Sequence, residues 1–175
     1  MQNIVLIGFM GTGKTAIGRI VARMLNYHFV DTDQMVEEAT NLTINQLFRK
    51  HGELRFRSEE ALVVKKLAGR ERLVIATGGG LVLNPENVKL LKQKGIFVLL
   101  TADPKVVLER VSRKNTRPLL AKGKNMETIM SLFQERSRFY AEYAEFTVDT
   151  SHISLEESAE RIVQIVKEQK EQANN

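Results

Sequence analysis

The sequence contains no cysteine among its 175 residues. A disulfide framework and a thiolate metal site are therefore excluded, and the cellular compartment must be inferred from other features. Long apolar runs are also missing, since none approaches the ~20 residues that a membrane-spanning helix needs. Residues 4–7 are too short for the core of a signal peptide and lack its basic lead-in. We therefore expect a cytoplasmic protein that binds no membrane.

A uniform basic arm is absent too, although the formal net charge is +5. Positive charge suits an anionic partner, which can be a nucleic acid, a membrane surface or a small polyanion such as ATP. Lys and Arg are spread along the chain, with one local cluster at residues 110–124. This distribution argues against a dedicated nucleic-acid role. The composition, 43% apolar and 27% charged, is typical of a soluble globular protein.

Short β-branched runs alternate with helical stretches. The expected strands are residues 3–7, 28–32, 72–77, 96–101 and 146–150. All are nearly continuous apolar runs, the pattern of parallel strands buried on both faces. The expected helices lie near 14–25, 33–40, 44–50, 53–68, 86–94, 105–113, 126–143 and 155–170. The alternation predicts right-handed crossovers and one three-layer α/β/α domain over residues 1–175.

Several of these helices have recognisable starts. Asn84 and Asp103 each precede a proline and are expected to cap a helix, and Thr43 and Ser154 begin sequences with the spacing of a capping box. The stretch from residue 33 to residue 68 contains no expected strand. It is long enough to form a small helical subdomain beside the sheet, which we place at about 33–61.

The stretch GFMGTGKT follows the first expected strand and precedes the first expected helix. Gly8, Gly13, Lys14 and Thr15 match the pattern G-x-x-x-x-G-K-[ST], in which backbone N–H groups surround phosphates at a helix N-terminus. Lys14 is expected to reach the β- and γ-phosphates, and the Thr15 hydroxyl to coordinate Mg²⁺. A chance match arises in roughly one chain in a hundred or fewer. We therefore predict nucleoside triphosphate binding.

Two aspartates, Asp31 and Asp33, end the second expected strand. Their spacing directs both carboxylates to one side of an extended chain, at the strand ends where open α/β sheets bind ligands. One carboxylate can serve a hydrated metal and the other a substrate hydroxyl. The alternative is that Asp33 only caps the next helix. The phosphate loop nearby favours the functional interpretation.

Three glycines, Gly78, Gly79 and Gly80, end the third expected strand, and we expect backbone there that no side chain covers, open to a ligand. A loose turn is the alternative. Arg57 lies three residues before Glu60 on a helix, so the carboxylate can hold the guanidinium in one pose, although such pairs usually lie on a solvated face. Arg136 alone reads as an ordinary helix cation. The basic loop at about 112–124 is long enough to close over a triphosphate, and surface decoration is the alternative.

Together these segments resemble the shikimate kinase family from residue 3 to about residue 165. The matching pieces are GFMGTGKT, DTD, FRSEE, TGGG, RPLL and ERSRFY, in the family's order and approximate spacing. The resemblance implies the P-loop fold of the nucleoside monophosphate kinases, with a five-stranded parallel sheet in the order 2-3-1-4-5. It also implies transfer of the ATP γ-phosphate to the 3-hydroxyl of shikimate, a step toward chorismate in aromatic amino acid biosynthesis, with one Mg²⁺ per subunit.

The resemblance assigns roles to the matching residues. It implies that Asp33 binds the 3-hydroxyl as base and that Asp31 assists Mg²⁺ through water. Arg57 and Arg136 would hold the shikimate carboxylate, next to the glycine loop and an apolar lining. The implied acceptor-binding set is Asp33, Phe48, Phe56, Arg57, Gly78, Gly79, Gly80 and Arg136. The implied ATP-binding set is Gly11, Thr12, Gly13, Lys14, Thr15, Ala16, Arg110 against adenine, and Arg117 in the lid, where Arg117 joins Lys14 and Asp33 as a catalytic group.

One departure concerns the loop near residues 152–155, where family members often carry a proline that packs on adenine. This chain has SHISLEE there, and we expect Leu155 to cover the base instead. Two alternatives stay open from the residues alone: a gluconate- or nucleotide-directed kinase, and a nucleotide-binding regulatory module without catalysis. A monomer is expected, because no strongly apolar surplus helix is apparent.

Overall fold

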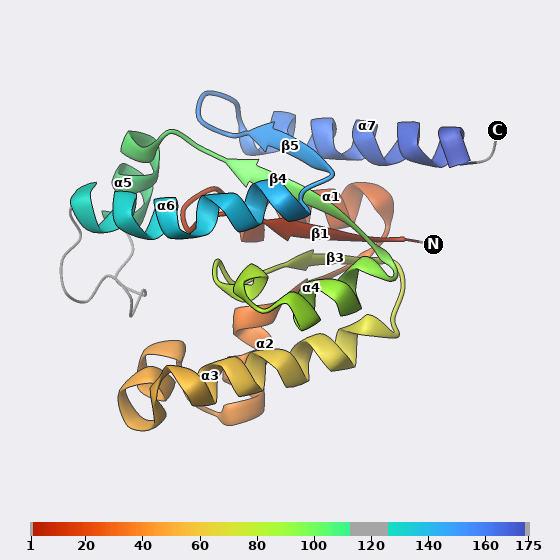
Figure 1. Cartoon of the computed structure of the whole chain (residues 1–175). Coiled ribbons are helices and arrows are strands. Elements are labelled where there is room, and N and C mark those ends of the chain that lie inside the picture. Colours follow the sequence, from red (N-terminus) through yellow and green to blue (C-terminus); the bar gives the residue numbers. More distant parts are fainter. Residues whose placement is uncertain (1, 113–125, 174–175) are drawn as a thin grey trace.

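The computed structural model describes residues 2–112 and 126–173, and it places a five-stranded sheet between two layers of helices (Figure 1). The strands are β1 (Asn3–Ile7), β2 (His28–Asp31), β3 (Leu73–Ala76), β4 (Gly95–Thr101) and β5 (Phe146–Asp149). They are paired in the order β2-β3-β1-β4-β5, and every pairing is parallel. The three-layer fold and the strand order implied by the resemblance are confirmed.

The helices largely follow the expected ranges. They are α1 (Lys14–Leu25), α2 (Thr32–Thr40), α3 (Ile44–Ala68), α4 (Pro85–Lys92), α5 (Pro104–Ser112), α6 (Met126–Tyr143) and α7 (Leu155–Ala173). A short 3₁₀ helix, η1 (Leu81–Leu83), was not expected, because three residues are too few to show a helical period. Within the described ranges, none of the helices combines the length and apolar character needed to cross a membrane.

All four helix starts predicted from cap sequences are confirmed. Thr43 and Ser154 each accept a backbone N–H three residues later and open a capping box. Asn84 and Asp103 each accept the N–H of the residue that follows the proline. These bonds satisfy donors that the first helical turn leaves without an intrahelical partner.

Helix α3 joins the two stretches expected as separate helices, 44–50 and 53–68. The helical path breaks at Gly52, which has φ 79° and ψ 175°, a conformation that favours glycine. Helix α2 and the first part of α3 therefore form a compact helical unit, at the lower edge of Figure 1. Its assignment as a subdomain at about 33–61 stays a prediction.

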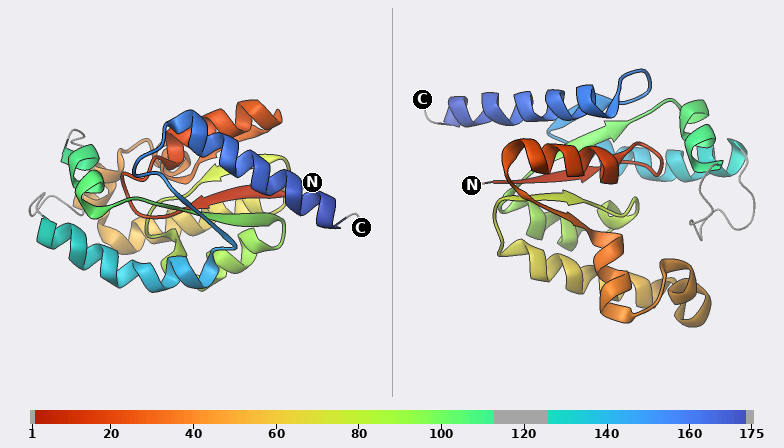
Figure 2. Two further views of the ribbon diagram at one scale, coloured as in Figure 1. Left: turned by 90° about the horizontal axis from the view of Figure 1, so that it is seen from above. Right: turned by 180° about the vertical axis from the view of Figure 1, so that it is seen from behind.

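Two apolar cores fill the two faces of the sheet. One core packs α1 and α7 against the sheet, and the other packs α3, α4 and α6 (Figure 2). Ile4 and Leu6 of β1 lie in the first core and Val5 and Ile7 in the second, all fully buried. The expectation of strands buried on both faces is wrong for β2 and β5, which are partly exposed because each has only one neighbouring strand.

Candidate active site

The predicted phosphate-binding loop lies between the end of β1 and the start of α1. Gly8, Gly11 and Gly13 have φ values of 137°, 79° and 94°, a region that L side chains rarely adopt. A Cβ on Gly8 would also lie 2.3 Å from the carbonyl oxygen of Leu100. The loop conformation therefore depends on glycine both for backbone freedom and, at Gly8, for space.

The N-terminus of α1 is open to an anion. Gly13 is the N-cap residue, no side chain caps the helix, and its first turn has no acidic residue. The Lys14 ammonium is buried and donates to the carbonyl oxygens of Gly8 (2.7 Å) and Phe9 (2.8 Å). A positive group and uncapped helical N–H donors thus lie at one loop, which is the arrangement that binds phosphate.

Asp31 connects this loop to α2. Its Oδ2 accepts the Thr15 hydroxyl at 2.8 Å, and its Oδ1 accepts the backbone N–H groups of Asp33 and Gln34. The alternative that Asp33 caps this helix is wrong, since the cap is Asp31. Thr15 and Asp31 present hard oxygen atoms side by side, the ligand type that Mg²⁺ prefers.

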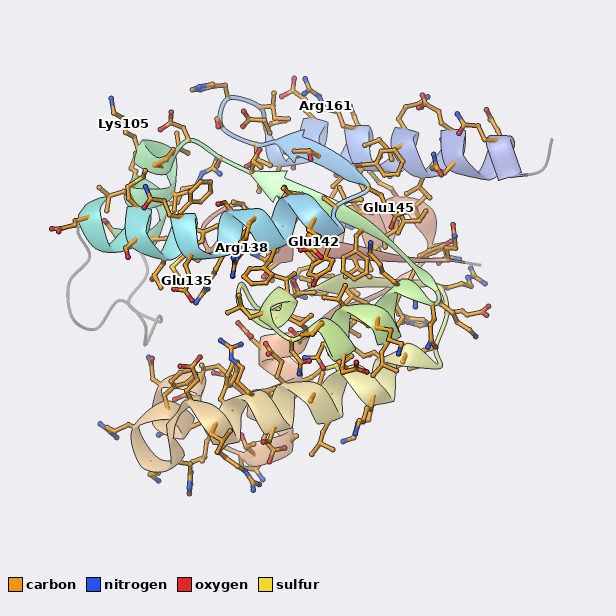
Figure 3. All side chains as sticks on the ribbon, viewed as in Figure 1. Lys105, Glu135, Arg138, Glu142, Glu145 and Arg161 are labelled. Atoms are coloured by element: carbon orange, nitrogen blue, oxygen red, sulfur yellow. The ribbon has the colours of Figure 1, made fainter. Side chains whose placement is uncertain are left out.

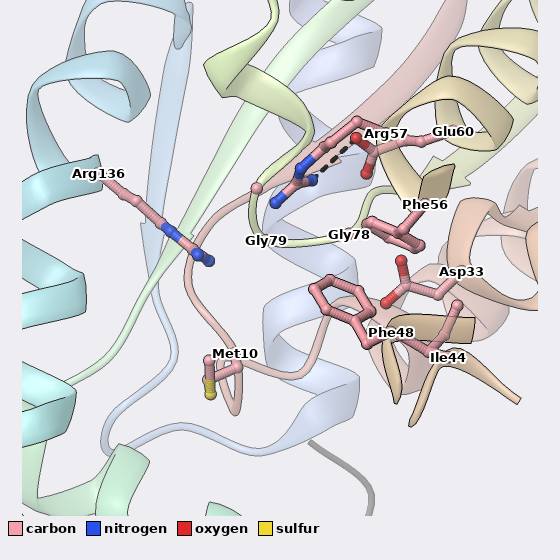
Figure 4. Close-up of a pocket in the computed structure, with 11 residues that line it drawn as sticks. Met10, Asp33, Ile44, Phe48, Phe56, Arg57, Glu60, Gly78, Gly79 and Arg136 are labelled. Carbon is pink, nitrogen blue, oxygen red and sulfur yellow. Dashed lines mark hydrogen bonds and ion pairs between the residues drawn. The ribbon is translucent and has the colours of Figure 1, made fainter. Parts of the chain in front are cut away.

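A pocket opens beside the loop, with polar and apolar side chains converging on it (Figure 4). The lining residues are Met10, Asp33, Ile44, Phe48, Phe56, Arg57, Glu60, Gly78, Gly79, Gly80 and Arg136. The structure thus brings together all eight residues of the acceptor-binding set. Met10 and Ile44 were missed, because an apolar residue in a loop or at a helix start carries no distinguishing sequence signal.

Each glycine of the 78–80 segment faces a different polar side chain. A Cβ on Gly78 would lie 2.4 Å from Asp33 Oδ1, and one on Gly80 would lie 2.4 Å from Arg57 Nη2. A Cβ on Gly79 would lie 3.4 Å from Arg136 Nη1. All three glycines line the pocket, as expected of backbone that is open to a ligand. Their lack of side chains also makes room for the three charged groups of the pocket.

Arg57 is held by two carboxylates of its own helix. Its Nη1 donates to Glu60 Oε2 at 2.9 Å and its Nη2 to Glu53 Oε1 at 3.0 Å. The prediction that Glu60 fixes this guanidinium is confirmed. Phe48 and Phe56 pack near it, with ring centroids 4.9 Å apart and ring planes tilted by 40°, and form the apolar side of the pocket.

Ionising the Glu60 carboxyl is energetically unfavourable because the group is buried. The side chain is 1% exposed, and its Oε1 has no hydrogen-bond partner among the described residues. Burial raises the pKa of Glu60 to about 7, against the lowering effect of the nearby Arg57. The carboxyl therefore changes charge near neutral pH inside the pocket.

Arg136 enters from the opposite side. Figure 4 shows its guanidinium and that of Arg57 extending into the pocket from α6 and α3 respectively. Arg136 is 4% exposed, and its Nε has no hydrogen-bond partner within the described ranges. A buried guanidinium with an unused donor is expected to bind an anion. Arg136 is therefore not an ordinary surface cation.

The residues expected near adenine lie around the phosphate loop. Arg110 donates to the carbonyls of Gly11 (3.2 Å) and Thr150 (2.8 Å), so it ties the loop to the end of β5. Leu155 is 42% exposed and lies beside Gly13. Both positions adjoin the loop, and their contact with adenine stays a prediction. Arg117 and residues 113–124 of the lid expected at about 112–124 fall outside the described residues.

Comparison with known proteins identifies the family. The family model for shikimate kinase matches residues 10–167. A shikimate kinase of Pelotomaculum thermopropionicum is 55% identical over 168 residues, covering 96% of this chain and 97% of its own. One of Desulforudis audaxviator is 49% identical, covering 96% and 88%.

A solved structure agrees with these sequences. The shikimate kinase of Acinetobacter baumannii, determined in complex with shikimate, superposes with a TM-score of 0.92 at 37% identity, covering 97% of this chain and 95% of that chain. Family membership decides against the regulatory-module alternative. The chain belongs to the shikimate kinase family and is an ATP-dependent kinase.

Proposed function

We propose that the chain transfers the γ-phosphate of ATP to the 3-hydroxyl of shikimate, giving shikimate 3-phosphate and ADP. One observation carries this proposal: a carboxylate, two guanidinium groups and a glycine loop meet in a pocket that begins at Met10 of the phosphate loop. This pocket suits a small hydroxylated acid. It has cations for the carboxylate, a carboxylate for the reacting hydroxyl, and backbone groups for the remaining hydroxyls.

On the nucleotide side, the N–H groups of Gly11 to Ala16 bind the phosphates at the N-terminus of α1. Lys14 exchanges its bonds to loop carbonyls for bonds to the β- and γ-phosphate oxygens. Arg110 and Leu155 adjoin adenine, and Arg117 reaches the transferring phosphoryl group. Transfer of this group depends mainly on positioning and charge neutralisation.

Mg²⁺ fits the residues present. The Thr15 hydroxyl would coordinate the ion directly, and Asp31, which already contacts that hydroxyl, would bind it through water. Among the described residues no group of three His, Cys, Asp or Glu could hold a metal, which agrees with an ion that relies on phosphates and water for most of its ligands. Such an ion neutralises charge on the phosphate oxygens.

On the acceptor side, Arg57 and Arg136 grip the carboxylate from opposite sides, since a planar guanidinium can bind it through two parallel bonds. Asp33 takes the proton of the 3-hydroxyl. The oxygen then forms the new bond to the γ-phosphorus while the bond to the β-phosphate oxygen breaks and ADP leaves. Phe48, Phe56 and the Gly79 backbone orient the ring.

The test is ADP release in a coupled assay with shikimate, gluconate and nucleoside monophosphates as acceptors. We expect turnover with shikimate alone, loss of turnover when Mg²⁺ is chelated, and recovery when the ion is restored. Phosphorus NMR of the product identifies the phosphorylated hydroxyl. ADP release that does not depend on shikimate would refute the proposal. We further propose a cytoplasmic monomer, which size-exclusion chromatography with light scattering tests for oligomeric state.

A further inference from the structure

Tyr140 lies on α6, one helical turn after Arg136, and is 3% exposed. Residues four apart lie on the same helix face, so both side chains point toward the 78–80 segment. The Tyr140 hydroxyl donates to the carbonyl oxygen of Gly79 at 2.5 Å. Tyr140 ends the segment ERSRFY, but the residues alone do not predict its partner, because the bond joins residues 61 positions apart.

The Gly79 carbonyl is held differently from those of its neighbours. The carbonyls of Gly78 and Gly80 accept backbone N–H groups of Leu81 and Leu83, both at 3.1 Å. These bonds belong to the turn that forms η1. The carbonyl of the middle glycine instead accepts from a side chain on another helix. The orientation of the Gly79–Gly80 peptide therefore depends on Tyr140.

We propose that Tyr140 is a positioning residue for the acceptor, acting through the peptide between Gly79 and Gly80. The peptide is planar and trans, so its C=O and N–H point in opposite directions. Fixing the Gly79 carbonyl toward α6 therefore also fixes the Gly80 N–H and the glycine backbone that faces the pocket. Glycines cannot hold this conformation by themselves, because they have the greatest backbone freedom.

The geometry around Gly79 supports this role. A Cβ at Gly79 would lie 3.4 Å from Arg136 Nη1 and 3.6 Å from the Tyr140 hydroxyl. The acceptor-binding cation and the tyrosine hydroxyl therefore both adjoin the Gly79 position, and the two side chains also interact with each other. Helix α6 therefore positions both the Arg136 guanidinium and, through Tyr140, the glycine backbone. A bound acceptor would contact both.

The hydroxyl is a donor over the whole working pH range. Burial raises the pKa of Tyr140 to about 12, although the charge of Arg136 partly offsets this effect. The contribution of Tyr140 should therefore not change between pH 6 and pH 9. This separates it from the contribution of Glu60, which titrates near neutrality.

The test replaces Tyr140 by Phe, which keeps the ring and removes the bond. This inference rests on the proposed function, so shikimate-dependent turnover of the wild type is measured first. Leaving a buried carbonyl without its donor is expected to raise the KM for shikimate roughly five- to thirtyfold. The KM for ATP and kcat should change little, because the glycine backbone contacts the acceptor equally before and during transfer.

Tyr143→Phe is the matched control. Tyr143 lies on the same helix, is partly buried, and has its ring 5.7 Å from Lys92 Nζ outside the pocket. We expect its KM values to equal those of the wild type. The melting temperature of each variant verifies that the fold is retained.

A second background separates the proposed route from a simple shift of α6. If Tyr140 acts through the glycine peptide, Tyr140→Phe should raise the KM for shikimate by a similar factor in the Arg136→Lys background. Disappearance of the effect there would mean that Tyr140 only places Arg136, and would overturn the inference. So would an unchanged KM in the single variant, or an effect that varies between pH 6 and 9. Absence of shikimate turnover in the wild type would instead refute the proposed function.

Discussion

The nucleotide side and the acceptor side of this site are built in different ways. The phosphate loop is one contiguous segment, residues 8–15, whose shape comes from positive φ values and whose lysine bonds to its own backbone. The acceptor pocket combines side chains of α2, α3 and α6 with a glycine segment, across residues 10 to 136. One side is specified by a local motif, and the other only by tertiary packing.

The difference predicts how each side responds to change. A substitution in the phosphate loop alters backbone that also packs against β4, so it affects folding and nucleotide binding together. A substitution in the acceptor pocket alters one of several converging side chains. It should affect the acceptor while nucleotide binding and stability are retained. The variants below test this separation.

The largest effect is expected from Asp33→Asn. Loss of the base should lower kcat by ~10²–10⁴, with ATP affinity and melting temperature unchanged. Steady-state kinetics and ATP titration measure the two effects separately. Asp103→Asn makes the same chemical change at a helix cap, where Asn serves as well as Asp, and should be neutral. Unchanged turnover in Asp33→Asn would remove the assignment of Asp33 as base.

A pair of glycine variants compares the two sides directly. In Gly8→Ala the new Cβ would lie 2.3 Å from the carbonyl oxygen of Leu100, and residue 8 has a φ of 137°. The backbone can relieve neither the clash nor the strained φ. The free energy of unfolding should fall by about 3 kcal/mol or more, and ATP binding should be lost. Chemical denaturation and ATP titration measure both.

In Gly80→Ala the new Cβ would lie 2.4 Å from Arg57 Nη2, the end of a flexible side chain, and the backbone is not in the left-handed region. The guanidinium can move aside, so we expect a folded protein with normal ATP affinity. The KM for shikimate should rise roughly tenfold or more, because the cation is misplaced. Equal losses of stability in the two variants would contradict the comparison.

The buried charge of Glu60 gives the acceptor side its own pH dependence. With its pKa raised from 4.5 to about 7, the folded protein keeps a proton that the unfolded chain releases between these values. The resulting stability is complete below about pH 4.5 and is lost as the pH rises through 7. Glu60→Gln imitates the protonated form. The stability of this variant relative to the wild type should therefore increase from pH 5 to pH 8, and its melting temperature should increase with it. The difference in unfolding free energy should reach about 3 kcal/mol.

Glu59→Gln is the control for that series. Glu59 pairs with Arg55 at 2.5 Å on the same helix, and neither residue lines the pocket. Its variant reports how much the loss of any helix ion pair changes the melting temperature. A difference between Glu60→Gln and wild type that is constant from pH 5 to pH 8 would show that Glu60 does not titrate in this range.

The contrast also explains what the sequence could predict. Local signals sufficed for β1, for the phosphate loop and for the four helix caps, because each depends on residues close together in the chain. The exposure of β2 and β5 was not predictable in this way, since an apolar run does not reveal how many neighbours a strand has. Local signals also could not predict that Asp31 caps α2, because both Asp31 and Asp33 are residue types that suit an N-cap.

The acceptor pocket needed the family resemblance. From the residues alone, Arg57 and Arg136 each read as a surface cation, and only packing shows that one is clamped by two carboxylates and the other is buried. The resemblance grouped them without giving a physical reason, and the structure places both in the lining of one pocket. The physical reason is that three adjacent glycines leave space for three charged side chains from other helices. The spacing of residues along the chain does not predict such contacts.

The smallest expected effect comes from Arg136→Lys. Lysine keeps the positive charge but is a point donor that cannot bind a carboxylate through two parallel bonds. The affinity for shikimate should fall by roughly tenfold, about 1.4 kcal/mol, while ATP affinity is unchanged. Isothermal titration with each ligand measures both.

Arg138→Lys is the matched control for this substitution. Arg138 is exposed on the same helix (Figure 3), over the ring of Phe139 at 4.6 Å and outside the pocket, so its replacement should leave both affinities unchanged. If Arg136→Lys weakened ATP instead of shikimate, the guanidinium would belong to the nucleotide side. The nucleotide side and the acceptor side would then not be independent, because a residue on α6 would contribute to ATP binding at the phosphate loop between β1 and α1.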